Sequence, residues 1–165
     1  MKVAIVFYSF SGNTEKVVQF VKDFFLRKNI PVEVFRLKPV KEEVSFLRQG
    51  IQAFFKKTIP ILEINYDLGS YDLVVFASPV WAFTISPALR SYLKKVKNLE
   101  RKKIVCFLTF GSGVGAKKAL RELEGILKSK RAEVIFSKNL VGAKAGDRSY
   151  LEESFRYLNK LFDFL

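Results

Sequence analysis

Short runs of apolar residues alternate along this chain with stretches in which apolar residues recur every three or four positions. The first run, Val3–Phe7, is continuous, as expected for a strand that is covered on both faces. After it, Val17, Val21 and Phe25 recur at helical spacing and predict an amphipathic helix. Further runs of strand character follow at 32–35, 73–77, 104–108 and 133–136.

The segments between the later strands are also predicted to be helical, at 87–96 and 116–127. A last helix is predicted to begin at Ser149, because Ser149 and Glu152 have the spacing of a capping box. Strands that alternate with helices form a parallel sheet with right-handed crossovers. The sequence therefore predicts a single α/β domain over residues 1–165, with a three-layer, doubly wound parallel sheet of five strands.

One segment, at about 39–66, is longer than a crossover between neighbouring strands requires. Within it apolar residues fall at helical spacing from Val44 to Phe55, so an inserted helix is predicted at 42–57. Basic and aromatic residues on this helix leave two interpretations open. It either docks on the sheet or contacts a membrane surface.

The histidine and cysteine content limits the kinds of catalytic and metal site that the chain can form. The chain contains no histidine and a single cysteine, Cys106. A lone cysteine forms neither a disulfide framework nor a thiolate cluster, so we expect no metal site and a reducing, cytoplasmic environment. Cys106 lies in an apolar run and is interpreted as a core residue, and Val3–Phe7 is too short for a secretion signal or a membrane span. Any redox chemistry must therefore use an organic cofactor.

The chain is strongly basic. Lysine and arginine number 29 against 16 acidic residues, which gives a formal net charge of +13. Such an excess favours anionic partners through long-range attraction. The sequence contains no helix-turn-helix, RNP or KH pattern, so no specific nucleic-acid partner is expected. The remaining classes of anionic partner are nucleotides, anionic lipid and acidic protein surfaces. Alternatively, the lysines serve solubility alone.

The connection at 9–14 joins the first strand directly to the first helix. Backbone N–H groups in such a turn can converge on one anion, and the helix N-terminus adds unpaired donors and a positive dipole end. The connection has no lysine and no Walker-type or dinucleotide glycine pattern, so a triphosphate or a pyrophosphate is not indicated. The alternative to an anion site is an ordinary helix cap. The predicted phosphate-binding residues are Ser9, Ser11, Gly12, Asn13 and Thr14.

Two further connections follow the third and fourth strands, and in a doubly wound sheet they meet the first one at the same edge. The connection after the third strand contains two prolines and Trp81, the only tryptophan of the chain. Aromatic residues beyond a strand end suit a flat ring ligand. The connection after the fourth strand has three glycines, which allow a close approach of the backbone. The predicted ring-binding residues are Pro79, Val80, Trp81, Ala82, Phe83, Gly111, Ser112 and Gly113.

These three connections resemble those of the flavodoxin-like family. Ser9, Ser11, Gly12 and Thr14 match its phosphate loop, and the stretch from Ser78 to Trp81 resembles its second flavin loop. The resemblance covers essentially the whole chain in the order of its elements. It implies a sheet in the order 2-1-3-4-5, with flavin mononucleotide (FMN) bound where the strand order reverses.

Electron-carrying flavodoxins are typically acidic, whereas this chain is basic. The resemblance therefore implies a small FMN-dependent oxidoreductase or electron-transfer protein rather than a flavodoxin proper, with NAD(P)H or a protein as electron donor or acceptor. No side chain is identified as a catalytic acid or base, and Tyr8 and Tyr150 are interpreted as structural. The alternatives are a basic membrane- or quinone-linked flavoprotein and a binding protein of the same fold without redox activity. Trp81, Phe83 and the insertion are candidates for a homo-oligomer interface.

Overall fold

The computed structural model describes residues 1–40 and 58–162. In these ranges, the parallel strands lie side by side in the order β2-β1-β3-β5-β6. The predicted order 2-1-3-4-5 is thereby confirmed, because β5 and β6 are the fourth and fifth strands of the prediction. The strands are β1 (Val3–Phe7), β2 (Val32–Arg36), β3 (Leu73–Trp81), β5 (Lys103–Phe110) and β6 (Glu133–Val141).

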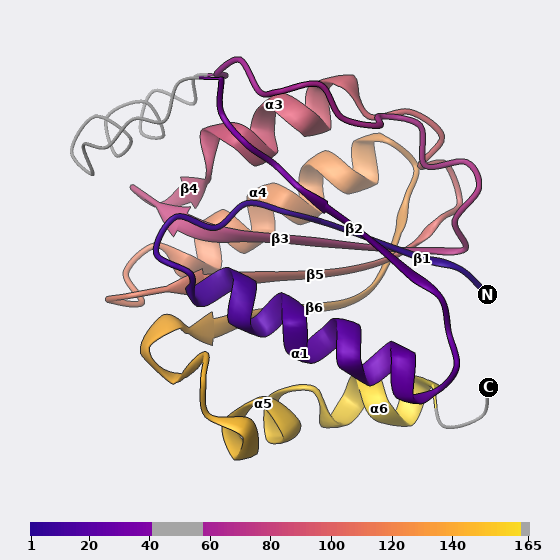
Figure 1. Cartoon of the computed structure of the whole chain (residues 1–165). Coiled ribbons are helices and arrows are strands. Elements are labelled where there is room, and N and C mark those ends of the chain that lie inside the picture. The colour runs from indigo at the N-terminus through magenta and orange to yellow at the C-terminus, as the bar shows by residue number, and fades with distance from the viewer. Residues whose placement is uncertain (41–57, 163–165) are drawn as a thin grey trace.

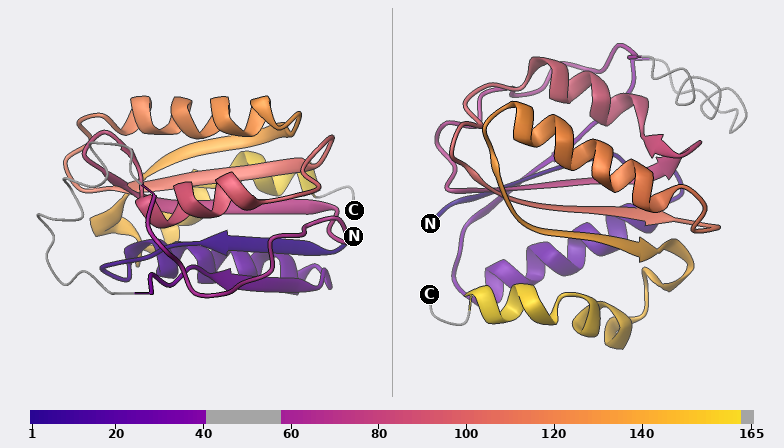
Figure 2. Two further views of the ribbon diagram at one scale, coloured as in Figure 1. Left: turned by 90° about the horizontal axis from the view of Figure 1, so that it is seen from above. Right: turned by 180° about the vertical axis from the view of Figure 1, so that it is seen from behind.

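Helices cover both faces of the sheet (Figures 1 and 2). One face carries α1 (Asn13–Arg27), α5 (Arg148–Ser154) and α6 (Arg156–Phe162), and the other carries α3 (Pro87–Lys95) and α4 (Ala116–Ser129). A short 3₁₀ turn, η1 (Gly142–Lys144), follows β6. The α/β class and the three-layer architecture predicted from the sequence are confirmed.

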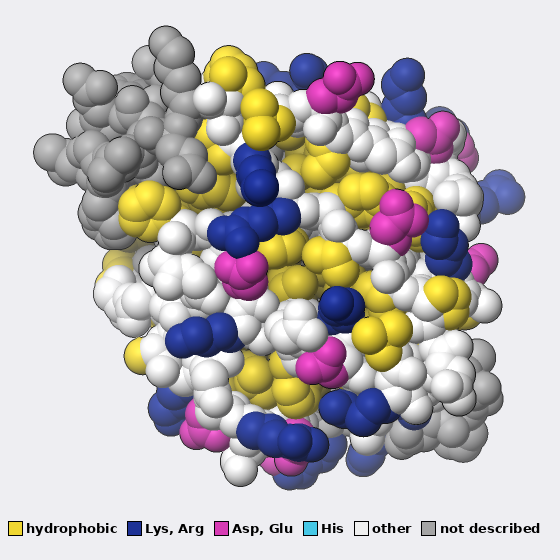
Figure 3. Space-filling model, viewed as in Figure 1, with side chains coloured by type: hydrophobic (Ala, Val, Ile, Leu, Met, Phe, Trp, Pro, Cys, Tyr) yellow, Lys and Arg dark blue, Asp and Glu magenta, His cyan; other side chains and the backbone are white. Residues whose placement is uncertain are grey.

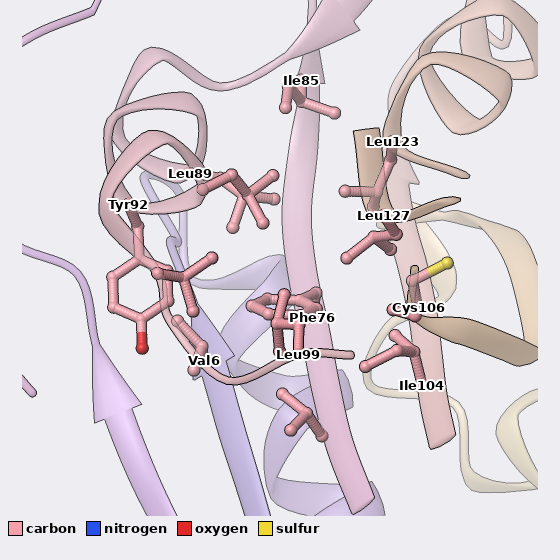
Figure 4. Packing of buried hydrophobic residues seen from close by; sticks show 14 of the residues in the cluster. Val6, Phe76, Ile85, Leu89, Tyr92, Leu99, Ile104, Cys106, Leu123 and Leu127 are labelled. Carbon is pink, nitrogen blue, oxygen red and sulfur yellow. The ribbon is translucent and has the colours of Figure 1, made fainter. Parts of the chain in front are cut away.

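The central strands are buried on both sides because helices cover both faces, as their continuous apolar sequences indicate. Along β1, Val3, Ile5 and Phe7 pack toward α1, while Ala4 and Val6 pack toward α3 and α4. Figure 4 shows the apolar cluster on the side of α3 and α4, where residues of β1 and β3 contact side chains from these two helices. This alternation fixes the register of the sheet, since a shift by one residue would exchange the two faces.

The third strand is longer than predicted. It was predicted to end at Ala77 and to be followed by a loop at 78–87, whereas β3 continues to Trp81 and turns back as β4 (Thr84–Ile85). The two strands are antiparallel, with Trp81 opposite Thr84. Beyond Ala77 the strand no longer pairs with β1, so this part of β3 is an edge on which a proline such as Pro79 is tolerated. The aromatic connection is therefore a hairpin.

The last helix also differs from its prediction. Its N-cap is Asp147 rather than Ser149, because the Asp147 carboxylate accepts a hydrogen bond from the Tyr150 backbone N–H at 3.0 Å. Glu152 does not complete a capping box with Ser149 and instead pairs with Arg148 one turn earlier, at 2.8 Å. The helix is divided at Phe155 into α5 and α6.

The whole of the helix predicted at 42–57 lies outside the described residues. On either side, the described chain runs antiparallel. The Val40 N–H donates to the Pro60 carbonyl at 3.0 Å, and the Leu62 N–H donates to the Lys38 carbonyl at 2.8 Å. The insertion thus leaves and rejoins the fold at one place, next to β2.

Basic side chains lie among acidic and uncharged ones on the described part of the face seen in Figure 3, and they do not form one continuous patch there. Across residues 1–40 and 58–162, no helix combines the length and the apolar character needed to cross a bilayer.

Replacing Gly125 with alanine should stabilise the protein. Gly125 lies within α4, and an added Cβ would contact nothing within 4 Å. The free energy of unfolding should rise by about 0.5–1 kcal/mol, because alanine loses less backbone entropy in a helix. Urea denaturation measures the change. An unchanged or lower value would show that α4 is not helical at this position.

Candidate functional site

The first predicted connection leads from the end of β1 into α1 at the edge of the sheet where the parallel strands end (Figure 1). Gly12 is the N-cap of α1, has a φ of 84° and provides no side chain to cap the helix. The backbone N–H groups of residues 10–14 donate no hydrogen bond to any described residue. A Cβ on Gly12 would meet nothing within 4 Å, so there is open space in front of this residue.

Two hydroxyls hold this connection in place. Ser9 Oγ accepts a hydrogen bond from the Glu15 N–H at 3.3 Å. The hydroxyls of Thr14 and Thr109 are both buried and share a hydrogen bond of 2.7 Å, which ties the start of α1 to the end of β5. Ser11 is exposed. The connection is therefore anchored by Ser9 and Thr14, and its backbone N–H groups are left available.

The local charge suits an anion. The N-terminus of α1 is the positive end of its helix dipole. The acidic residue of the first turn, Glu15, would oppose an anion, but Arg36 places Nη1 2.6 Å from its Oε1. This pair offsets the only acidic side chain of that turn.

The second and third connections face each other across a hollow of about 460 Å³. The β3–β4 hairpin forms one wall and the glycine-rich connection after β5 forms the other. Seven of the predicted ring-binding residues line it, and Pro79 does not. The lining residues are Val80, Trp81, Ala82, Phe83, Phe110, Gly111, Ser112, Gly113 and Val114.

A ring contact joins the two parts of the site. Phe10, in the first connection, packs edge-on against Trp81, with ring centroids 5.5 Å apart and planes at 74°. Trp81 is buried and Phe10 is exposed. The connection at 9–14 is therefore adjacent to the hollow at 80–83 and 110–114.

The tip of the hairpin is strained and closely packed. Ala82 and Phe83 both have positive φ, 42° and 67°, as a two-residue turn of type I′ requires. Phe83 lies so close to Gly115 that a Cβ on Gly115 would be 2.8 Å from the Phe83 Cα. Gly115 itself has a φ of 77°. Only glycine fits this position without movement, because both its conformation and its neighbour exclude a side chain.

Three parts of the site were not predicted from the sequence. Phe110 and Val114 also line the hollow, whereas only Gly111, Ser112 and Gly113 of this connection were predicted to bind the ring. Gly142, after β6, adjoins Asn13, since a Cβ there would lie 3.1 Å from Asn13 Nδ2 and 3.2 Å from the Phe110 carbonyl oxygen. The Asn13 side chain thus lies against a fourth connection, which the three-connection pattern did not include.

Tyr150 and Cys106, two other side chains with reactive groups, have structural roles. The Tyr150 hydroxyl accepts a hydrogen bond from the Val141 N–H at 2.9 Å, which holds the end of β6. Cys106 is fully buried, as predicted. Burial raises the pKa of the Cys106 thiol to about 12, so the thiol stays protonated and is not a nucleophile.

Residues 1–146 match the family described as NADPH-dependent FMN reductase. The chain belongs to the NADPH-dependent FMN reductase family. It is accordingly an FMN-binding, flavodoxin-like protein of oxidoreduction or electron transfer, and the family supports NAD(P)H as its electron donor. No curated protein matches the chain.

Solved structures share the fold of this FMN reductase family member at low sequence identity. A flavoprotein from Lactobacillus acidophilus, in complex with FMN, is 20% identical, with a TM-score of 0.68 over 90% of this chain and 98% of its own. The two-electron reduced flavodoxin of Megasphaera elsdenii is 18% identical, with a TM-score of 0.62 over 92% and 93%. Oxidised flavodoxin 2 of Bacillus cereus is 17% identical, with a TM-score of 0.60 over 94% and 100%. These likenesses show the flavodoxin-like fold.

Proposed function

We propose that the chain is an NAD(P)H-dependent flavin reductase that holds FMN at the connections after β1, β3 and β5. The phosphate-binding groups are the N–H groups of residues 10–14, which include the predicted Ser11, Gly12, Asn13 and Thr14, while Ser9 anchors the connection through its hydroxyl. The ring-binding residues are Val80, Trp81, Ala82, Phe83, Gly111, Ser112 and Gly113, with Phe110 and Val114 added from the lining of the hollow. Pro79 supports the hairpin from its strand.

This proposal rests on the backbone N–H groups of residues 10–14, none of which donates a hydrogen bond to a residue that the structure describes. Consecutive N–H donors beside a glycine of positive φ form an anion-binding concavity. A phosphate monoester suits it, because its oxygens can accept several N–H bonds at once while the helix dipole favours their charge. The open space in front of Gly12 leaves room for the group.

The hollow beside it suits the flavin ring. Its hairpin wall is apolar and aromatic, which removes a flat ring from water. On its opposite wall, the N–H groups of Ser112, Gly113 and Val114 donate to no described residue and are available to polar ring atoms. Bound FMN would supply the electron transfer, while the chain's own residues bind it, orient it and exclude water.

The purified chain tests the proposal. We expect it to take up FMN with quenching of both the flavin and the Trp81 fluorescence, and the loaded protein to oxidise NADPH steadily when a quinone or a dye accepts the electrons. The chain freed of FMN is the control and should not oxidise NADPH. FMN uptake without NADPH oxidation would contradict the reductase and favour an electron carrier. Absence of uptake would contradict the site.

A further inference from the structure

A buried ion pair adjoins the hairpin wall of the hollow. Arg90 of α3 places Nη2 2.8 Å from Glu122 Oε1 of α4, and the two side chains are only 10% and 16% exposed. The same Nη2 donates to Thr84 Oγ1 at 2.5 Å. The Thr84 hydroxyl in turn donates to Glu122 Oε2. Two helices are therefore joined to one residue of β4.

Thr84 occupies the position that determines where the hairpin lies. It follows the strained residues Ala82 and Phe83 directly, and it pairs with Trp81 across the hairpin. Residues in such conformations persist only where the surroundings hold them. Fixing Thr84 therefore fixes Trp81, and with it the wall that faces residues 111–113.

The stability of the fold does not by itself explain why Arg90 and Glu122 form a buried ion pair. Burying two charges costs free energy that their attraction repays only with full hydrogen bonding. The Arg90 Nε is buried and has no partner among the described residues. Apolar side chains of similar size often replace such pairs without loss of stability. What they cannot replace is the directed link to the Thr84 hydroxyl.

We propose that Arg90 and Glu122 are positioning residues of the FMN site, which act through Thr84 to hold the Trp81 wall at a fixed place opposite the glycine-rich connection. This role rests on the proposed function, because it is a role toward bound FMN.

Two variants separate positioning from stability. Thr84→Val keeps the ion pair but removes its link to the hairpin. The triple variant Thr84→Val/Arg90→Met/Glu122→Leu removes all three polar groups together, so that none is left buried without a partner. Arg131→Met/Glu100→Gln is the matched control, since that pair is exposed, at 78% and 56%. For each protein, thermal unfolding, FMN affinity and acrylamide quenching of Trp81 are measured.

In the triple variant, the midpoint of thermal unfolding should stay at or above the wild-type value, while FMN affinity falls about tenfold, the effect of losing one ordering hydrogen bond. Thr84→Val should lose FMN affinity to a similar extent. In both, acrylamide should quench Trp81 of the FMN-free protein more strongly than in wild type, a readout that needs no bound flavin. The control variant should match wild type throughout.

Wild-type FMN affinity and quenching in both variants would overturn the positioning role, as would a loss of affinity that merely follows a loss of thermal stability. A wild-type chain that takes up no FMN would overturn the proposed function and, with it, this role. The two failures are distinguished by the wild-type titration run alongside the variants.

Discussion

Gly12→Asp should weaken FMN binding by at least about a hundredfold, since like charges about 4 Å apart at an effective dielectric constant of about 20 repel by about 4 kcal/mol. The new carboxylate would enter the open space in front of residues 10–14, where we place the phosphate. The fold should tolerate the change, because aspartate adopts positive φ more readily than most residues and its Cβ meets nothing there. Fluorescence titration with FMN measures the effect.

Gly12→Asn is the matched control. Asparagine has the shape of aspartate and the same tolerance of positive φ, but no charge. Any strain at a φ of 84° is therefore common to both variants, and the difference between them isolates the repulsion. Riboflavin, which lacks the phosphate, should bind both variants equally. Equal FMN affinities in the two variants would show that the phosphate lies elsewhere.

Gly115→Ala should lower both the free energy of unfolding and the affinity for FMN. The new Cβ would lie 2.1 Å from Phe83 Cδ1 and 2.8 Å from the Phe83 Cα, so the hairpin tip must move. Together with the positive φ of Gly115, the overlap should cost about 2–4 kcal/mol of unfolding free energy. Since the displaced residues form one wall of the hollow, FMN affinity should fall at least about tenfold. Urea denaturation and FMN titration measure the two effects.

Gly113→Ala is the control that shows the cost of backbone strain without displacement of the hairpin tip. Gly113 has the same φ of 77°, but the nearest atom to its added Cβ is Phe110 Cε2 at 3.3 Å, on a ring that can shift. This variant should lose only about 1–2 kcal/mol, the cost of placing alanine at positive φ. If both variants lost the same amount of stability, the contact between Gly115 and Phe83 would not constrain the hairpin.

The parallel sheet could be predicted from the sequence because its strands are buried on both faces. Continuous runs such as Val3–Phe7 have no competing interpretation at that length. The β3–β4 hairpin could not be predicted, since its turn residues, Ala82 and Phe83, are not the glycine or asparagine that favour positive φ. Tertiary contacts, above all with Gly115, hold the turn instead.

The start of the last helix shows a similar limit. Asp147 and Ser149 are both good N-cap residues, and the sequence pattern favoured Ser149 through Glu152. The backbone leaves η1 so that the Asp147 carboxylate reaches the Tyr150 N–H, which places Ser149 inside the helix. The choice between the two N-cap residues depends on where β6 ends, so it cannot be predicted from the spacing of residues within the helix.

The three connections of the candidate site could be located because parallel strands end at one edge of the sheet. The sequence could not predict which polar groups of these connections form hydrogen bonds within the protein. The hydroxyls of Ser9 and Thr14 proved to be engaged within the protein, and this follows from the proximity of Glu15 and Thr109 in the fold. The contact of Phe10 with Trp81 likewise joins residues that are far apart in the chain.

In the proposed site, the N–H groups of residues 10–14 bind the phosphate of FMN. Amide NMR of the ¹⁵N-labelled chain, titrated in parallel with FMN and with riboflavin, tests it at each residue. We expect the amide resonances of residues 10–14 to shift strongly with FMN and little with riboflavin, while those of 111–113 shift with both. Resonances of 10–14 that respond equally to the two flavins, or to neither, would contradict it.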